Sequence, residues 1–170
     1  ARITSYRSFA FKKAEYLKLI NEDMPANVKR IEFAKSYGDL SENAEYQYAK
    51  DEQRALMQKQ SLMQQDLDTV KPGDFASAST SEVMPGVGVV VSADGEEKTY
   101  WILGEWDNDI ELGIISSKAR LSVNLMGKKI GDSFDLPKVD GTVGTGTVKE
   151  IVPLTDDIRK WMEIPEGMQI

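Results

Sequence analysis

The chain has 170 residues, of which 41% are hydrophobic, carries a net charge of −7, and contains neither cysteine nor histidine. Its length suffices for one ordinary domain or two small ones, with enough apolar side chains for a modest core. The two missing residue types exclude disulfides, thiolate or imidazole metal sites, cysteine nucleophiles and histidine bases, and leave carboxylates as the ligands for a hard metal ion.

The charge is unevenly distributed along the chain. Residues 1–75 carry 12 basic and 12 acidic side chains, whereas residues 76–170 carry 9 basic and 16 acidic ones. Nonspecific affinity for duplex nucleic acid needs a clustered basic surface, so this balance argues against tight duplex binding and favours a protein partner. Because no apolar run reaches the roughly 18 residues of a membrane span and residues 1–22 do not resemble a signal peptide, we expect a cytoplasmic protein without a membrane partner.

A long helix is predicted from about residue 7 to residue 36. Apolar residues recur there at spacings of three or four, which marks one face of a helix: Leu17, Ile20, Met24, Val28, Ile31 and Ala34. Pro25 lies inside this pattern. Because proline removes a backbone hydrogen bond, we expect the helix to bend there, or to break and restart.

A second helix is predicted after Gly38, as far as about Val70, with apolar residues at every seventh position from Ala49 onward. Only two or three residues separate it from the first, so the two must form an antiparallel hairpin, and Gly38 suits the turn because it accepts positive φ. At about 1.5 Å per residue, roughly 28 residues per arm give a rod on the order of 40 Å long.

A small sheet domain is predicted after the helix breaker at residues 71–73, which marks the boundary between domains 1–73 and 74–170. Its strands are expected at residues 87–91, 99–103, 114–116, 133–136 and 142–152, mostly antiparallel. A short helix is expected at residues 118–126 and another in the tail near residues 156–162. The fold class is therefore α+β: a helical coiled-coil hairpin followed by a β-rich domain. Within it, Trp101 is expected in the core and Trp106 at the surface.

The turn of the hairpin carries three carboxylates within seven residues: Asp39, Glu42 and Glu45. One interpretation is a capping box, in which Asp39 caps the second helix and Glu42 reaches back, a contribution of about 0.5–2 kcal/mol. The other is metal delivery, since Mg²⁺ usually accepts one or two protein carboxylates and keeps several waters. So sparse a site needs a partner to complete it.

The tip also resembles a known family. Residues 34–46 read AKSYGDLSENAEY and residues 49–53 read AKDEQ, which is similar to the tip signature of the GreA/GreB transcript-cleavage factors. Further similarity, including YWILG at residues 100–104, extends the resemblance over roughly residues 10–152.

The resemblance implies a function in transcription. A coiled-coil hairpin of this family enters the secondary channel of bacterial RNA polymerase, and an FKBP-like C-terminal domain docks on the channel rim. Asp39 and Glu42 are then the tip acids that help hold the second catalytic Mg²⁺ for cleavage of backtracked RNA. The chain would be a monomeric accessory factor rather than an enzyme, with no stably bound cofactor, and would meet the 3′ end of the nascent RNA inside the polymerase.

Residues beside the tip acids receive weaker assignments. Ser41 and Asn43 would orient the attacking water or a phosphate, Lys35 and Lys50 would touch RNA phosphates, and Tyr46 would support the turn or stack on a base. Each of these five is alternatively an ordinary solvated or packing residue.

The sequence departs from the family pattern at the expected docking loop. Ala119-Arg120 stands where the family commonly has a Ser-Pro pair. The rim-docking surface is therefore assigned to Ser116, Ser117, Lys118, Ala119 and Arg120. Alternatively, Lys118 and Arg120 are merely exposed charges on a short helix. The altered loop also leaves open a polymerase inhibitor or regulator that binds the same channel without stimulating cleavage; a prolyl isomerase is a third possibility, for which no pocket is identified.

Overall fold

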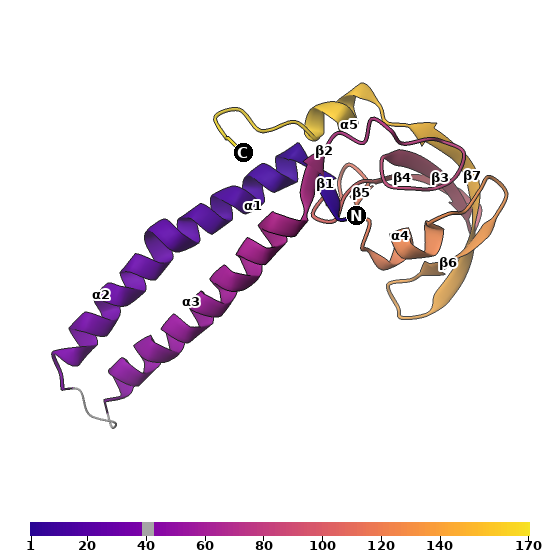
Figure 1. Ribbon diagram of the computed structural model, residues 1–170. Coiled ribbons are helices and arrows are strands. Elements are labelled where there is room, and N and C mark those ends of the chain that lie inside the picture. The colour runs from indigo at the N-terminus through magenta and orange to yellow at the C-terminus, as the bar shows by residue number, and fades with distance from the viewer. Residues whose placement is uncertain (39–42) are drawn as a thin grey trace. The chain divides into compact units, whose positions relative to one another are not determined.

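The computed structural model describes residues 1–38 and 43–170, and the chain forms two compact units (Figure 1). The hairpin unit contains residues 10–69, and the sheet unit contains residues 1–9 together with residues 70–170. Residues 1–9 thus group with the sheet, and not with the hairpin as predicted from the sequence. In the described part of the chain, no helix is both long and apolar enough to cross a membrane.

The first arm of the hairpin is helical throughout, but its hydrogen-bonding pattern changes once from α-helical to π-helical and back. Helix α1 (Tyr6–Lys18) continues into a π-helical turn, η1 (Leu19–Asp23), and then into α2 (Met24–Lys35). Pro25 lies in the first turn of α2, directly after η1. Because proline has no N–H to donate and its ring crowds the preceding turn, the regular hydrogen-bond ladder is interrupted here, where the sequence predicted an irregularity.

The second arm, α3 (Ala44–Thr69), packs antiparallel to α2 (Figure 1). The predicted seam positions Ile31, Ala34, Ala49 and Met63 are buried, as expected. The predicted burial of Leu17 and Val28 is wrong, because these side chains are 42% and 47% exposed. A π turn inserts an extra residue, so one constant spacing cannot carry the face of α2 back across η1 to Leu17. Val28 lies after η1, and there its neighbour Asn27 occupies the seam position together with Ile31 and Ala34.

A polar residue lies in the middle of this seam. Asn27 is 1% exposed; its amide Nδ2 donates to the carbonyl oxygen of Ala49 at 3.0 Å and to Oε1 of Glu52 at 2.7 Å. Arg30 also binds Glu52, through Nε at 2.9 Å and Nη2 at 2.6 Å. A single buried amide with specific partners fixes the register of two helices, because any slip would leave it unsatisfied.

The sheet unit is built on five strands in the order β5-β4-β3-β7-β6. They are β3 (Val87–Ala93), β4 (Glu96–Ile102), β5 (Ile114–Ile115), β6 (Ser133–Pro137) and β7 (Val143–Pro153). Neighbours are antiparallel except for the parallel pair β4 and β5. Helix α4 (Arg120–Leu125) packs against β6, and α5 (Asp156–Trp161) follows the last strand (Figure 1). The predicted sheet and both short helices are confirmed; its FKBP-like character stays a prediction.

Two apolar clusters form the core of the sheet unit. Val87, Val89 and Val91 of β3 are buried in one cluster that also contains Leu125 of α4. Trp101 packs against a second cluster, as predicted. Trp106 is not at the surface: it is half-buried, and its ring centroid lies 6.2 Å from that of Phe9.

The N-terminal segment adds a small parallel sheet that the sequence did not predict. Strand β1 (Ile3–Ser5) pairs with β2 (Lys71–Gly73), so the run interpreted as a helix breaker is itself a short strand. This pairing explains why residues 1–9 belong to the sheet unit.

Candidate functional site

Three of the predicted tip residues, Asp39, Ser41 and Glu42, lie outside the described residues. Their assignment to metal binding and catalysis, or to support of the tip, therefore stays a prediction. The flanking residues up to 38 and from 43 onward are described, and they form the first part of the candidate site.

The end of α2 is closed by Gly38. Its N–H donates to the carbonyl oxygen of Lys35 at 2.9 Å, and its φ is +111°. Only glycine adopts this conformation without a steric cost, so the prediction of a glycine-dependent turn is confirmed.

Asn43 connects the two arms. Its Oδ1 accepts a hydrogen bond from the backbone N–H of Tyr46 at 3.1 Å, so it is the N-cap of α3. Its Nδ2 donates to the carbonyl oxygens of Ala34 at 2.9 Å and Gly38 at 2.5 Å, at the end of the other arm. One side chain thus satisfies backbone groups at the end of α2 and at the start of α3.

This arrangement corrects the capping interpretation of the tip acids. Helix α3 begins at Ala44, and Asn43 occupies its N-cap position, so a capping box that starts at Asp39 would lie four residues too early. In the described structure Asn43 is engaged with the backbone, which differs from the predicted role of orienting water or phosphate.

The remaining predicted tip residues lie on the helices. Lys35 is exposed in the last turn of α2, and Tyr46 is half-buried in the first turn of α3. Lys50 is half-buried, and its Nζ donates to Oε1 of Gln53 at 3.0 Å on the same helix. Lys35 is thus the predicted cation that presents its charge at an exposed position.

An apolar groove that the sequence did not predict lies between α2 and α3. It has a volume of about 690 Å³ and is lined by Lys29, Arg30, Phe33, Ala34, Ala44, Glu45, Tyr48 and Ala49. Phe33 and Tyr48 are 64% and 73% exposed, and Phe33 meets Tyr37 edge to face at 5.4 Å. The available signal was the presence of aromatic residues off the predicted seam.

Metal binding by the described residues alone is not indicated. Between residues 1 and 38 and from residue 43 onward, no group of three or more acidic side chains is arranged to hold a metal ion. Carboxylate oxygens at positions 39 and 42 have the chemistry that Mg²⁺ prefers, but two such residues leave most of its coordination to other ligands.

The second part of the candidate site is the docking segment, residues 116–120. Ser116 is central to its internal bonding: its Oγ donates to the carbonyl oxygen of Glu105 at 2.7 Å and accepts from the N–H of Lys118 at 3.1 Å. Its carbonyl oxygen accepts from Ser122 Oγ at 2.6 Å and from the N–H of Ala119 at 3.0 Å. Ser116 therefore shapes the segment from within.

Exposure separates the five docking residues into two groups. Ser116, Ser117 and Ala119 are half-buried, whereas Lys118 and Arg120 are exposed. Ala119 is the N-cap of α4, with φ −60° and ψ 146°, and contributes no side-chain cap. A Ser-Pro pair at these positions would place serine at the N-cap and proline at N1, the residues best suited to each place. The departure from the family pattern thus weakens a helix start and adds an exposed cation.

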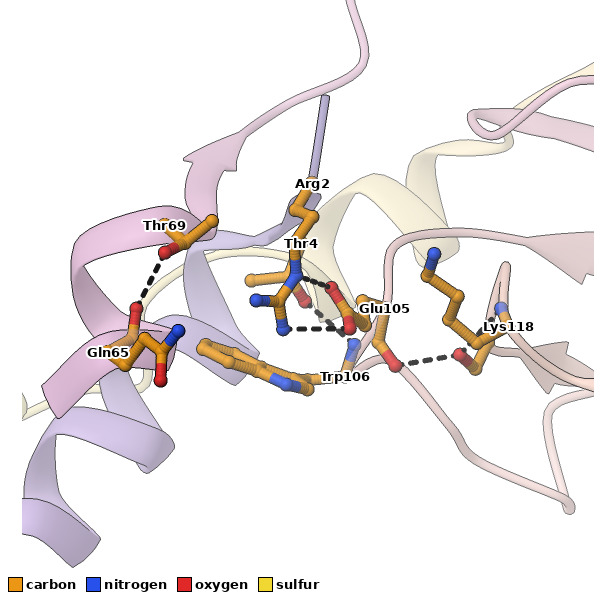
Figure 2. A network of polar contacts seen from close by, with 8 residues as sticks. Arg2, Thr4, Gln65, Thr69, Glu105, Trp106 and Lys118 are labelled. Atoms are coloured by element: carbon orange, nitrogen blue, oxygen red, sulfur yellow. Dashed lines mark hydrogen bonds and ion pairs between the residues drawn. The ribbon is translucent and has the colours of Figure 1, made fainter. Parts of the chain in front are cut away.

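Glu105 carries the charge opposite this segment. Arg2 binds its carboxylate with two donors, Nε to Oε2 at 2.8 Å and Nη2 to Oε1 at 2.9 Å (Figure 2). The hydrogen bonds from Arg2 hold the pKa of Glu105 below its ordinary value; burial opposes this effect, and the charges of Arg2 and Lys118 add to it.

Comparisons with known proteins agree with the two-part architecture. A family model described as "Transcription elongation factor, N-terminal" matches residues 3–71, and one described as "Transcription elongation factor, GreA/GreB, C-term" matches residues 78–153.

Relatives named "Transcription elongation factor GreA" include proteins of ordinary and of much greater length. The protein from Lactococcus lactis is 39% identical over 137 residues, covering 79% of this chain and 85% of the relative. The protein from Borreliella burgdorferi is 34% identical over 84% of this chain, and this chain spans only 16% of its length. The protein from Chlamydia pneumoniae is 34% identical over 74% of this chain, which spans 18% of its length.

Two solved structures also align with the chain. The "GreA factor homolog 1 (Gfh1)" protein of Thermus thermophilus has a TM-score of 0.41 and 14% identity, covering 89% of this chain and 98% of that one. A "transcription elongation factor GreA/GreB" from Nitrosomonas europaea has a TM-score of 0.40 and 21% identity, covering 55% and 78%.

Proposed function

This chain belongs to the GreA/GreB family of transcription elongation factors, and on that premise we propose that it binds RNA polymerase in the secondary channel and stimulates Mg²⁺-dependent cleavage of backtracked nascent RNA. It acts as an accessory factor: the polymerase performs the hydrolysis, and the chain contributes tip residues. Cleavage releases a misplaced 3′ end and so rescues an arrested complex.

One observation carries this proposal. Asn43 hydrogen-bonds Gly38, the last described residue before the tip, and thereby joins the two ends between which Asp39 and Glu42 stand in the sequence. The two carboxylates thus belong to a short connection between paired helices, within the segment that matches the family's N-terminal model. Because Asn43 already caps α3, the helix start does not require either acid.

The chemistry follows from the ligand types. Asp39 and Glu42 would supply carboxylate oxygens to a Mg²⁺ whose other ligands come from the polymerase and water. A bound Mg²⁺ supplies charge stabilisation and a more acidic water for in-line attack on a phosphodiester. Ser41, Lys35 and Lys50 remain proposed contacts to the RNA or its phosphates, and Tyr46 a proposed support of the turn.

A second candidate function is inhibition or other regulation of RNA polymerase from the same channel. The observation that favours it is Ala119-Arg120, which replaces a helix-capping pair in the docking segment with an uncapped start and an exposed cation. A factor that docks differently can occupy the channel without delivering its tip.

The test is RNA cleavage in backtracked elongation complexes at saturating factor concentration. We compare wild type with Asp39→Asn and Glu42→Gln, and use Asp51→Asn as a matched control, because Asp51 is an exposed α3 carboxylate paired with Arg54. Both tip variants are expected to lose roughly tenfold or more of the stimulated rate, because loss of a residue that only supports a metal ligand already costs about 10–100-fold, while the control retains the rate.

Three outcomes discriminate between the candidates. Wild-type rates in both tip variants would refute metal delivery. Binding of the wild-type chain without any stimulated cleavage would support the regulator. Loss of cleavage that parallels a lower melting temperature would assign the tip acids to stability instead.

A further inference from the structure

The N-terminal residues contact the loop that precedes the docking segment. Glu105 N–H donates to the carbonyl oxygen of Ile3 at 2.8 Å. Trp106 N–H donates to Oγ1 of Thr4 at 3.2 Å (Figure 2). At Gly104 the two backbones approach so closely that an added Cβ would lie 2.3 Å from Cα of Thr4. The loop at residues 104–107 therefore follows the path of β1.

A buried carboxylate holds the same loop to the N-terminal segment. Asp107 is fully buried and accepts hydrogen bonds from the N–H and Oγ of Ser5 at 3.0 and 2.5 Å, from Oγ of Ser8 at 2.5 Å and from the N–H of Gly104 at 2.7 Å. Removal of the serine donors would leave buried carboxyl oxygens without hydrogen-bond partners, so the loop and the segment are tightly coupled.

The loop in turn holds the docking segment. The carbonyl oxygen of Glu105 accepts from Oγ of Ser116 at 2.7 Å, and that of Gly104 accepts from the N–H of Ser117 at 3.3 Å. Ser116 then accepts from the N–H of Lys118. A continuous series of hydrogen bonds thus runs from residues 2–5, through residues 104–107, to residues 116–118. Figure 2 shows the part of it that joins Arg2 and Thr4 to Glu105 and Trp106.

Arg2 adds a side-chain connection to this series. Its guanidinium holds both oxygens of the Glu105 carboxylate, and the pair is partly buried, with side-chain exposures of 33% and 17%. Two parallel charged hydrogen bonds fix orientation as well as distance. They therefore restrain the residue whose carbonyl oxygen anchors Ser116.

We propose that Arg2, acting through Glu105, is a positioning residue for the docking segment and thereby tunes the affinity of the chain for an acidic face of RNA polymerase that meets Lys118 and Arg120. This inference rests on the proposed function, in which residues 116–120 dock. The N-terminal segment, distant in sequence, then acts as a support for a binding surface on another part of the same unit.

The experiment measures equilibrium binding of the full chain to RNA polymerase by competition against a fluorescently labelled wild-type copy. The variants are Arg2→Ala, the conservative Arg2→Lys, and the double variant Lys118→Ala/Arg120→Ala, alone and combined with Arg2→Ala. We expect Arg2→Ala to weaken binding about three- to tenfold, the range for a partly buried charged pair, and Arg2→Lys to recover part of the loss.

A combined variant separates positioning from an independent effect. If Arg2 acts through the docking segment, Arg2→Ala adds little once Lys118 and Arg120 are alanine, because coupled residues are not additive. Fully additive losses would overturn the inference. Hydrogen exchange gives a direct structural readout: the amides of Ser117 and Lys118 are expected to exchange faster in Arg2→Ala, and unchanged exchange would count against positioning.

Failure of the inference is distinguishable from failure of the proposed function. Unchanged binding in Arg2→Ala, with weakened binding in the Lys118/Arg120 double variant, overturns positioning alone. Unchanged binding in both overturns the docking segment and the inference with it, while stimulated cleavage by the wild-type chain in parallel reactions leaves the tip function standing.

Discussion

Replacement of Asn43 by alanine is expected to destabilise the hairpin unit by about 2–3 kcal/mol. The substitution removes the N-cap of α3, which costs about 1 kcal/mol for asparagine. It also removes the donor for the carbonyl oxygens of Ala34 and Gly38, and each net hydrogen bond contributes about 1 kcal/mol. The sum is an upper value, because one side chain makes all three interactions.

Native-state hydrogen exchange of the α2 and α3 amides is the suitable assay, because it reports the opening free energy of this unit separately from the sheet unit. Asn43→Ser is the matched variant. Serine retains a capping oxygen but is too short to bridge the arms, so it should recover about 1 kcal/mol of the loss. An Asn43→Ala hairpin within about 0.5 kcal/mol of wild type, the range of ordinary surface substitutions, would refute the bridging role.

Three further substitutions test other parts of the structure. Asn27→Ala should destabilise the hairpin by about 1–3 kcal/mol in the same exchange measurement, since it leaves a buried carbonyl oxygen without its donor. Ala119→Ser should raise the stability of the sheet unit by about 0.5–2 kcal/mol in urea denaturation, because the residue already has N-cap geometry; an unchanged midpoint would contradict this. Hydrogen bonds from Asn27 and then Arg30 hold the pKa of Glu52 in the folded chain below its ordinary 4.5. The stabilisation that the Glu52 carboxylate gives the hairpin is therefore present above the ordinary pKa and is lost as the pH falls through the lower pKa of the folded state. In Glu52→Gln the acid-side decline in hairpin stability should therefore be shallower, and a decline as steep as in wild type would assign it to other groups.

Hydrophobic periodicity predicted the hairpin because helix seams repeat along the chain and depend on neighbouring residues. It failed at Leu17, where the π turn before Pro25 changes the spacing on which the prediction relied. It failed at Val28 because the polar Asn27, and not an apolar residue, occupies that position of the seam. The strand at residues 3–5 was missed for a different reason. Its partner lies at residues 71–73, and a three-residue parallel pair has no local pattern to reveal so distant a contact.

The candidate site was predictable to the extent that it depends on residue type. A glycine turn and an acidic cluster can be recognised in sequence, and Gly38 has the expected conformation. Two features could not be predicted from the sequence: the bridging contacts of Asn43 and the Arg2–Glu105 pair. Each joins segments that only the fold brings together.

The position of the α3 cap bears directly on the chemistry proposed for the tip. Had Asp39 been the N-cap, its replacement would have altered helix stability and metal affinity together, and a loss of cleavage would have had two explanations. Asn43, an uncharged amide, caps the helix instead. Substitutions at Asp39 and Glu42 therefore leave the cap in place, and a fall in cleavage without a fall in hairpin stability would isolate the contribution of their carboxylates.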